Sequence, residues 1–339
     1  MLGIRRREFI TIVGGAAAAA SIFGTTTAHA QRAGKVWRIG FLASARRPVS
    51  IESTSYGGFL QGMRELGYVE GRDFVMEWRF VEGRFELYPV LAAELVRAQV
   101  DIVVAGNSTA VRLMQQASSS IPIVVVVAND PVGLGLVASL ARPGGNVTGL
   151  ATSADDTTPK QLELLAKAVP KLSRVGILSS PDNPNAAPVL RAAQAAALPV
   201  GMQLLPVEAR TPLDFESAFA TLLREHAEAL MVASGGSFGG GSLLRGRLVD
   251  LAMRARLPTI SAFREDVEAG MLMSYGESYK DFNRRAAFYV DKIIRGAKPA
   301  DLPVQQPTRF FLTINRKTAD TLGLIMPLEL LVQTDEIIE

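Results

Sequence analysis

The sequence predicts an α/β protein built from two doubly wound, Rossmann-like lobes. Short β-branched apolar runs alternate with helical segments, and this alternation restarts after a turn-rich stretch at residues 142–149. Several of the predicted strands are almost wholly apolar, as expected when helices cover both faces of a parallel sheet. The 309 residues from Gln31 to the end of the sequence are enough for two domains of ordinary size.

The first lobe is expected over residues 31–150. The spacing of its apolar residues predicts strands that alternate with helices. The predicted strands lie at 36–42, 73–79, 102–105 and 123–127, and the predicted helices at 56–66, 88–98 and 109–117. Ligands in such sheets lie beyond the carboxyl ends of the strands, so two lobes of this type predict a cleft between them.

The second lobe is expected over residues 151–278, where the alternation is similar. Its predicted strands lie at 175–179, 203–206, 229–233, 259–261 and 271–275, and its helices at 161–168, 186–198, 215–224 and 244–256. A long helix at 279–294 then leads into an extended stretch at 303–315 and a short tail helix. Residues 279–339 are therefore expected to cross over and return to the first lobe.

The first 30 residues have the three parts of a cleavable export signal. A basic start at Arg5, Arg6 and Arg7 precedes a short apolar stretch, and the sequence Ala28-His29-Ala30 supplies an A-x-A end. The apolar stretch is too short for a stable membrane anchor, which needs roughly 20 residues. The Arg-Arg-x-Phe-Ile core favours the twin-arginine route over general secretion. The sequence thus predicts cleavage after Ala30 and a mature protein in the periplasm.

Charge argues against a nucleic-acid partner. The chain has 36 basic and 33 acidic residues, and removal of residues 1–30 takes away three arginines and one glutamate. The mature chain then carries 33 basic and 32 acidic residues, a net charge of +1. It has no basic stripe or tail of the kind that neutralises phosphates.

Cysteine and histidine usage excludes several kinds of chemistry. The chain has no cysteine, which rules out disulfides, thiolate nucleophiles and cysteine-bound metals. Of two histidines, His29 leaves with the signal, and His226 alone cannot build a multi-histidine metal site. The nucleotide-binding and zinc-protease motifs are missing as well. We therefore expect no cofactor and no metal.

Small polar residues follow the predicted strands of both halves. Such residues are ordinary helix N-caps individually, but together they predict a polar, hydrogen-bonding cleft. The candidate ligand-binding residues are Ser44, Asn107, Ser108, Asp130, Asp182, Asn183, Ser234 and Tyr275.

A serine-hydrolase motif gives an alternative function. The segment 235–239 matches G-x-S-x-G around Ser237, after an apolar strand and before a helix. The triad order of such enzymes requires a histidine after the serine, and no histidine follows Ser237. The five glycines in residues 235–241 favour a flexible loop at the rim of the cleft. We therefore predict a binding protein and not an enzyme.

Several segments resemble one family of solute-binding proteins from ABC importers. They are residues 59–71, the Ile-Pro-Ile-Val sequence at 121–124, the Asp-Pro-Val-Gly segment at 130–137 and the Arg-Pro-Gly-Gly-Asn-Val-Thr-Gly segment within 140–149, together with the signal. The resemblance implies a two-lobed type I periplasmic binding protein with a three-crossover hinge. It also implies a monomer that passes a small solute to the permease subunits in the membrane. Some members are linked to tryptophan, phenylalanine or other aromatic ligands.

The same resemblance places the ligand contacts at Ser44, Asn107, Ser108, Asp130, Asp182 and Asn183. For an amino acid, Asp130 would pair with the ammonium group, while Ser108 and Asn183 would bind the carboxylate with helix N-terminal amides. Asp130 and Asn183 also fit simple turns before proline. Ser234 and Tyr275 follow from strand-end position alone, and Tyr275 could equally face solvent or stack on the ligand. A ligand-sensing domain for a membrane receptor or kinase would have the same lobes, and the ligand is not identified.

Overall fold

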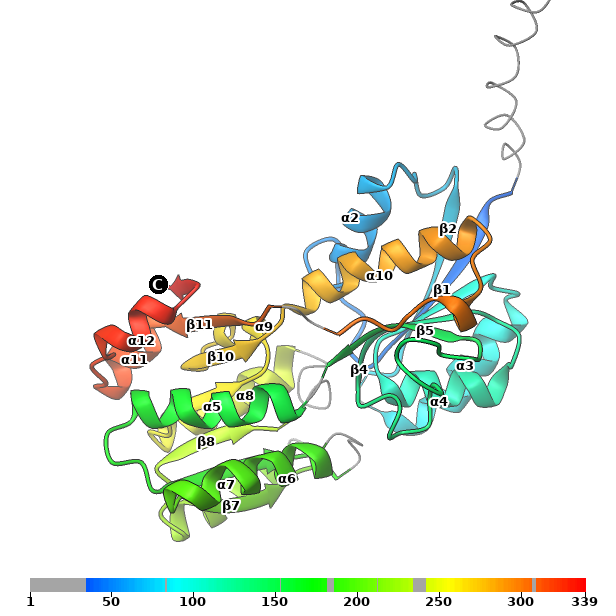
Figure 1. Cartoon of the computed structure of the whole chain (residues 1–339). Helices are drawn as coiled ribbons and strands as arrows, with labels where there is room; N and C mark the ends of the chain where they lie inside the picture. The colour runs from blue at the N-terminus through cyan, green and yellow to red at the C-terminus, as the bar shows by residue number, and fades with distance from the viewer. Residues whose placement is uncertain are drawn as a thin grey trace, which may run out of the picture.

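The chain forms two lobes, each with its own sheet (Figure 1). The computed structural model describes residues 35–82, 84–152, 154–181, 186–211, 213–233, 242–306 and 309–339. Two α/β lobes of mostly parallel strands are what the sequence predicts, and this fold class is confirmed. None of the helices in these described ranges has the length and apolar character needed to cross a membrane.

The first lobe has a five-stranded parallel sheet in the order β2-β1-β3-β4-β5. Its strands are β1 (Trp37–Ala43), β2 (Phe74–Phe80), β3 (Ile102–Ala105), β4 (Ile123–Asn129) and β5 (Val147–Thr152). Its helices are α2 (Gly57–Glu65), α3 (Tyr88–Arg97) and α4 (Ser108–Ala117), with a 3₁₀ turn η2 (Phe85–Leu87) before α3.

Both faces of this sheet are covered, because its central strands are apolar on both sides. In β1, Ile39 and Phe41 pack into one core with α2, whereas Leu42 packs into a second core with α3 and α4. All seven residues of β4 are buried for the same reason. The first core is completed by α10 (Tyr279–Ile294), which arrives from far along the sequence and lies beside α2 (Figure 1).

The second lobe has a seven-stranded sheet in the order β12-β11-β10-β9-β8-β6-β7. Its strands are β6 (Arg174–Ser179), β7 (Gln203–Glu208), β8 (Ala229–Val232), β9 (Thr259–Ser261), β10 (Met273–Gly276), β11 (Phe311–Asn315) and β12 (Glu336–Ile338). Its helices are α5 (Ala154–Ala168), α6 (Ala186–Ala197), α7 (Asp214–Arg224), α8 (Ser242–Arg254), α9 (Arg264–Glu268), α11 (Arg316–Leu322) and α12 (Leu328–Gln333). The buried residues form one core that includes α5 and α6 and another that includes α7 and α8.

The chain passes between the lobes three times. It leaves the first sheet after β5, returns between β10 and α10, and leaves again after the 3₁₀ turn η4 (Pro299–Asp301) and Gln305, which pairs with Leu150 beside β5. Helix α10 packs into the core of the first lobe. Strands β11 and β12 pair in the second sheet, which corrects the expectation that all of residues 279–339 return to the first lobe.

The reason for this difference lies in the second sheet. Leu312 and Ile314 of β11 are buried in the core of the second lobe and pair along β10. Since β10 runs towards the boundary between the lobes and the chain re-enters from that boundary, β11 is antiparallel to β10. Because β12 pairs with β11 in parallel, these two strands run opposite to β6–β10, which are parallel to one another.

Candidate ligand-binding cleft

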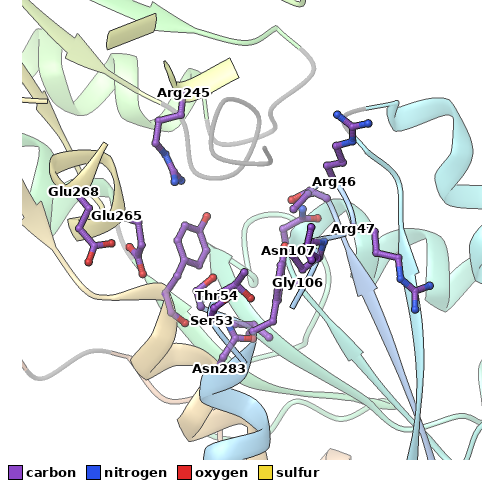
Figure 2. A pocket seen from close by; sticks show the side chains of 18 residues that line it. Arg46, Arg47, Ser53, Thr54, Gly106, Asn107, Arg245, Glu265, Glu268 and Asn283 are labelled. Carbon is purple, nitrogen blue, oxygen red and sulfur yellow. Dashed lines mark hydrogen bonds between the residues drawn. The ribbon is translucent and has the colours of Figure 1, made fainter. Parts of the chain in front are cut away.

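A cleft lies between the lobes, at the carboxyl ends of strands from both sheets. It has an outer compartment of about 700 Å³ and a smaller inner compartment of about 80 Å³. The outer one is lined by the loop after β1, the start of α2, and residues of α8 and α9 (Figure 2). The inner one is lined by the ends of β4, β8, β9 and β10 and by α5. Asn107 and Tyr279 line both compartments.

Asn107 is held in the wall by its role as a helix cap. Its Oδ1 accepts a hydrogen bond of 2.9 Å from the backbone N–H of Ala110 and so caps α4, while its Nδ2 donates to the Tyr88 hydroxyl at 2.9 Å. The Tyr88 hydroxyl also shares a hydrogen bond with Ser44, and burial raises the pKa of Tyr88 to about 12. These bonds fix the Ser44 and Asn107 turns relative to each other.

The opposite wall of the outer compartment carries a buried charge cluster. Arg245 of α8 forms an ion pair with Asp266 of α9 at 2.7 Å, and both side chains are largely buried. Beside them Glu265 accepts weak hydrogen bonds through Oε1 from Ser278 Oγ and the Lys280 N–H, each at 3.4 Å. Burial raises the pKa of Glu265. The cluster joins α8, α9 and the start of α10 at one edge of the cleft.

Four buried side-chain oxygens in the described part of the chain lack a hydrogen-bond partner. They are Ser108 Oγ, Glu265 Oε2, Glu277 Oε2 and Asn283 Oδ1. Glu265 and Asn283 line the outer compartment, Glu277 lines the inner one, and Ser108 follows Asn107 at the start of α4. Buried polar atoms are normally paired, because an unpaired one costs about 1–3 kcal/mol. Three of these four atoms belong to residues that line the cleft, and the fourth follows a lining residue.

The inner compartment contains one carboxylate among neutral polar groups. Thr158 and Gln161 of α5 are almost fully buried, and Gln161 Nε2 donates to the carbonyl oxygen of Tyr275 at 2.8 Å. Glu277 follows β10, and burial raises its pKa to about 7, against the attraction of Arg285 and with a contribution from Asp281. This carboxyl group therefore changes charge near neutral pH.

Glu277 makes folding stability pH-dependent. Between its ordinary pKa near 4.5 and its folded value of about 7, the folded state binds more protons than the unfolded state, so stability falls as pH rises. When the pH is raised from 5 to 8, the free energy of unfolding of wild type should fall by about 2 kcal/mol more than that of Glu277→Gln, after allowance for solvent screening. Urea unfolding at each pH measures this difference. The matched variant Glu329→Gln, at an exposed site on α12, should follow wild type. Equal slopes for wild type and Glu277→Gln would contradict the assignment.

Two arginines at the mouth of the outer compartment are free. Arg46 and Arg47 are exposed on the loop after β1 and have no ion-pair or hydrogen-bond partner in the structure described. Figure 2 shows them across the cleft from Arg245, Glu265 and Glu268. Unpaired guanidinium groups attract carboxylates, so the mouth on the first-lobe side favours an acidic group.

Aromatic rings complete the wall. The rings of Phe263 and Tyr279 stack with centroids 4.0 Å apart and an interplanar angle of 22°. Both residues line the inner compartment together with Phe282, and Tyr56 lines the outer one. Burial raises the pKa of Tyr56 and Tyr279 well above the usual range, so both phenols stay neutral. Such a wall suits a flat apolar group.

The structure brings together some of the residues predicted from sequence. Ser44 and Asn107 line the outer compartment, and Ser108 is buried next to Asn107 with an unpaired hydroxyl. Asp182, Asn183 and Ser234 lie outside the described residues, as does Ser237 of the hydrolase motif.

Asp130 and Tyr275 lie in other surroundings. Asp130 is exposed with φ of 44°, and its carboxylate accepts a hydrogen bond of 2.9 Å from the Gly133 N–H, which is the turn that the sequence left as an alternative. Tyr275 is partly buried against the core of the second lobe and packs on Phe310, with ring centroids 5.7 Å apart. Neither residue lines the two compartments described.

Sequence reasoning missed Arg245, Glu265, Glu277 and Tyr279. Glu277 directly follows β10, so its position after a strand is a local signal that could have indicated it. Arg245 and Glu265 lie within or next to helices, where charged residues are ordinary, so no local signal marked them. The described residues contain no cluster of three or more His, Asp or Glu side chains that could hold a metal ion.

Comparisons with known proteins agree with this architecture. The family described as ABC transporter substrate binding protein matches residues 49–338. A curated tyrosine-binding protein from Clostridioides difficile is 22% identical over 267 residues, which cover 79% of this chain and 76% of the relative.

Solved structures support the same fold. A conserved domain protein from Vibrio cholerae has 25% identity and a TM-score of 0.81, over 89% of this chain and all of that protein. An ABC domain from Streptococcus pneumoniae, solved in complex with L-Trp, has 24% identity and a TM-score of 0.79, over 88% of this chain and all of that domain. At 24% identity, the likeness to the Streptococcus pneumoniae domain is evidence for the fold alone.

Proposed function

Because the chain belongs to the family of ABC transporter substrate binding proteins, we propose that its interlobe cleft captures an amino acid-like solute with an aromatic or other flat apolar side chain. The observation that carries this proposal is the set of unpaired buried oxygens beside the stacked Phe263 and Tyr279 rings. Polar atoms without partners call for a polar ligand head, and the rings suit an apolar side chain. The tyrosine-binding relative supports this choice of ligand class.

Family membership confirms the resemblance found in the sequence and the expectation of a binding protein. Proteins of this family bind substrates and do not transform them, so the hydrolase alternative built on Ser237 is set aside. The family implies a small-molecule ligand and the membrane subunits of a transporter as partners.

We further propose that the protein captures its ligand by hinge closure and delivers it to a membrane permease. The three chain passages between the lobes would serve as the hinge, and a ligand that contacts both walls would favour the closed form by its greater affinity for it. The signal at residues 1–30, which lies outside the described residues, supports export through the twin-arginine route, cleavage after Ala30 and a location in the periplasm. The monomer is proposed from the family resemblance alone.

The test is thermal unfolding of the purified protein, freed of carried-over solute by unfolding and refolding. The panel contains tyrosine, tryptophan, phenylalanine, leucine, aromatic acids and sugars. A ligand at about 100 times its dissociation constant adds roughly 2.7 kcal/mol, which raises the Tm by about 4 °C in a chain of this size. A shift confined to sugars, or no shift with any compound, would contradict the proposal.

Substitution of two asparagine residues that each cap a helix tests where the ligand binds. Asn107 caps α4 in the cleft, and Asn315 caps α11 in the second lobe by accepting from the Thr318 N–H at 2.9 Å. Asn315 does not line either compartment. Replacing either with alanine should lower the free energy of unfolding by about 1–2 kcal/mol. Only Asn107→Ala should also shrink the Tm shift produced by the ligand. Equal ligand-induced shifts in the two variants would place the ligand elsewhere.

A further inference from the structure

Glu277 stands out because it is the single acidic side chain among the residues that line the inner compartment, which includes no Lys, Arg or His. The other polar groups of that lining are hydroxyls and amides, among them Asn107, Thr158 and Gln161. Glu277 is 9% exposed, and its Oε2 is buried without a hydrogen-bond partner in the described structure. Buried acceptors normally have a hydrogen-bond partner, so this oxygen can accept a donor from a bound molecule.

The positively charged side chain of Arg285 makes only a weak hydrogen bond to Glu277. Arg285 of α10 reaches Oε1 at 3.5 Å, the upper limit for a hydrogen bond, and its second amino group contacts Gln305 Oε1 at the same distance. Asp281, also on α10, repels a charge on Glu277. No group from these elements bonds Oε2, so that oxygen remains available.

Glu277 also borders a groove of about 430 Å³ on the second lobe. The two arginines of that groove are already neutralised. Arg264 holds Glu336 through two bonds of 2.6 and 2.7 Å, and Arg309 pairs with Asp335 at 2.9 Å. The groove therefore supplies no unpaired cation for Glu277, and the cleft is the side from which a partner can come.

Other unpaired atoms of the cleft point to the same chemistry. Glu265 Oε2 and Asn283 Oδ1, near the start of α10, are hydrogen-bond acceptors only. By contrast, the free guanidinium groups of Arg46 and Arg47 lie at the mouth on the first-lobe side. The cleft is thus polarised, with acceptors near the hinge and donors at the mouth.

We propose that Glu277 is the residue that selects ligands with a protonated amine, which it holds through Oε2 in the inner compartment of the cleft. This inference rests on the proposed function and adds to it the charge of the ligand group that enters the inner compartment. The step involves no covalent change: the ammonium group donates to Glu277, and a carboxyl group that was protonated gives its proton to solvent.

The first test is calorimetric binding at pH 6.5 with three forms of tyrosine, tryptophan, phenylalanine and leucine: the free amino acid, the N-acetyl derivative and the acid without the amine. Wild type should bind the amino acid form at least 30-fold more tightly, an order-of-magnitude expectation for a buried charge pair. Glu277→Gln should lose most of this preference, and Glu277→Asp should retain part of it. The control Glu329→Gln, on the exposed side of α12, should behave as wild type.

The second readout is the number of protons released on binding, obtained from calorimetry in buffers of different ionisation enthalpy. With a pKa of about 7, Glu277 is roughly three-quarters protonated at pH 6.5 and should release most of that proton when the amine binds. Glu277→Gln should release almost none, whereas a residue that only stabilised the fold would leave the release unchanged.

The outcomes separate the inference from the function on which it rests. If wild type binds the amino acids and their amine-free forms equally, or if Glu277→Gln keeps both the preference and the proton release, the inference is overturned and the binding function stands. If wild type binds none of the compounds, both are overturned. Circular dichroism shows whether each variant is folded, and glutamine reproduces the neutral form of the side chain.

Discussion

Replacing Gly62 with alanine should lower the free energy of unfolding by about 2–3 kcal/mol, although alanine is the better helix former by about 1 kcal/mol. Gly58 and Gly62 lie one turn apart on α2, where α2 packs against α10 (Figure 1). A methyl group on Gly62 would overlap the carbonyl oxygen of Arg284 and come within 2.8 Å of the Ala287 side chain. Backbone atoms cannot move aside without separating the two helices.

Urea unfolding measures this effect, and another helical glycine provides the control. Gly246 of α8 has open space where its Cβ would lie, so Gly246→Ala should be neutral or stabilising by up to about 1 kcal/mol. If both substitutions stabilise the protein, the close contact between α2 and α10 does not exist as described. That contact matters for function, because α10 carries Tyr279 and Asn283 into the cleft.

Replacing Tyr279 with alanine should weaken ligand binding by about 10- to 100-fold and cost about 2 kcal/mol of stability. The ring stacks on Phe263 and lines both compartments, so its loss removes contact area for the ligand and leaves a void beside Phe263. Tyr279→Phe should keep most of the affinity, because the ring provides the contact and the phenol stays neutral. Calorimetry with the aromatic amino acid that gives the largest thermal shift is the measurement.

Phe288 on the same helix is the matched control for that substitution. It is 43% exposed and packs edge-on against Tyr289 and not against the cleft. Phe288→Ala should leave ligand affinity within about twofold of wild type. Wild-type affinity in Tyr279→Ala would contradict a binding site at the stacked rings and would direct attention to other surfaces of the lobes.

Local features of the molecule were predictable to within a few residues. The helix expected at 279–294 has those bounds in α10, and the strand ends at Ser44 and Asn107 lead into the cleft. The turn at Asp130 was one of two alternatives, and its hydrogen bond to Gly133 is local as well. The spacing of apolar residues, the helix caps and the turns each depend on residues a few positions apart. They can therefore be predicted from a single sequence.

The sequence by itself determined the two-lobed α/β class, the order of its elements and the absence of cysteine chemistry. Only the tertiary structure decided that Glu265, Glu277 and Tyr279 border one cleft and that β11 and β12 belong to the second sheet. These juxtapositions depend on where the chain passes between the lobes. That path is set by the packing of α10 on α2 and by the pairing of β11 along β10, contacts between residues far apart in the chain.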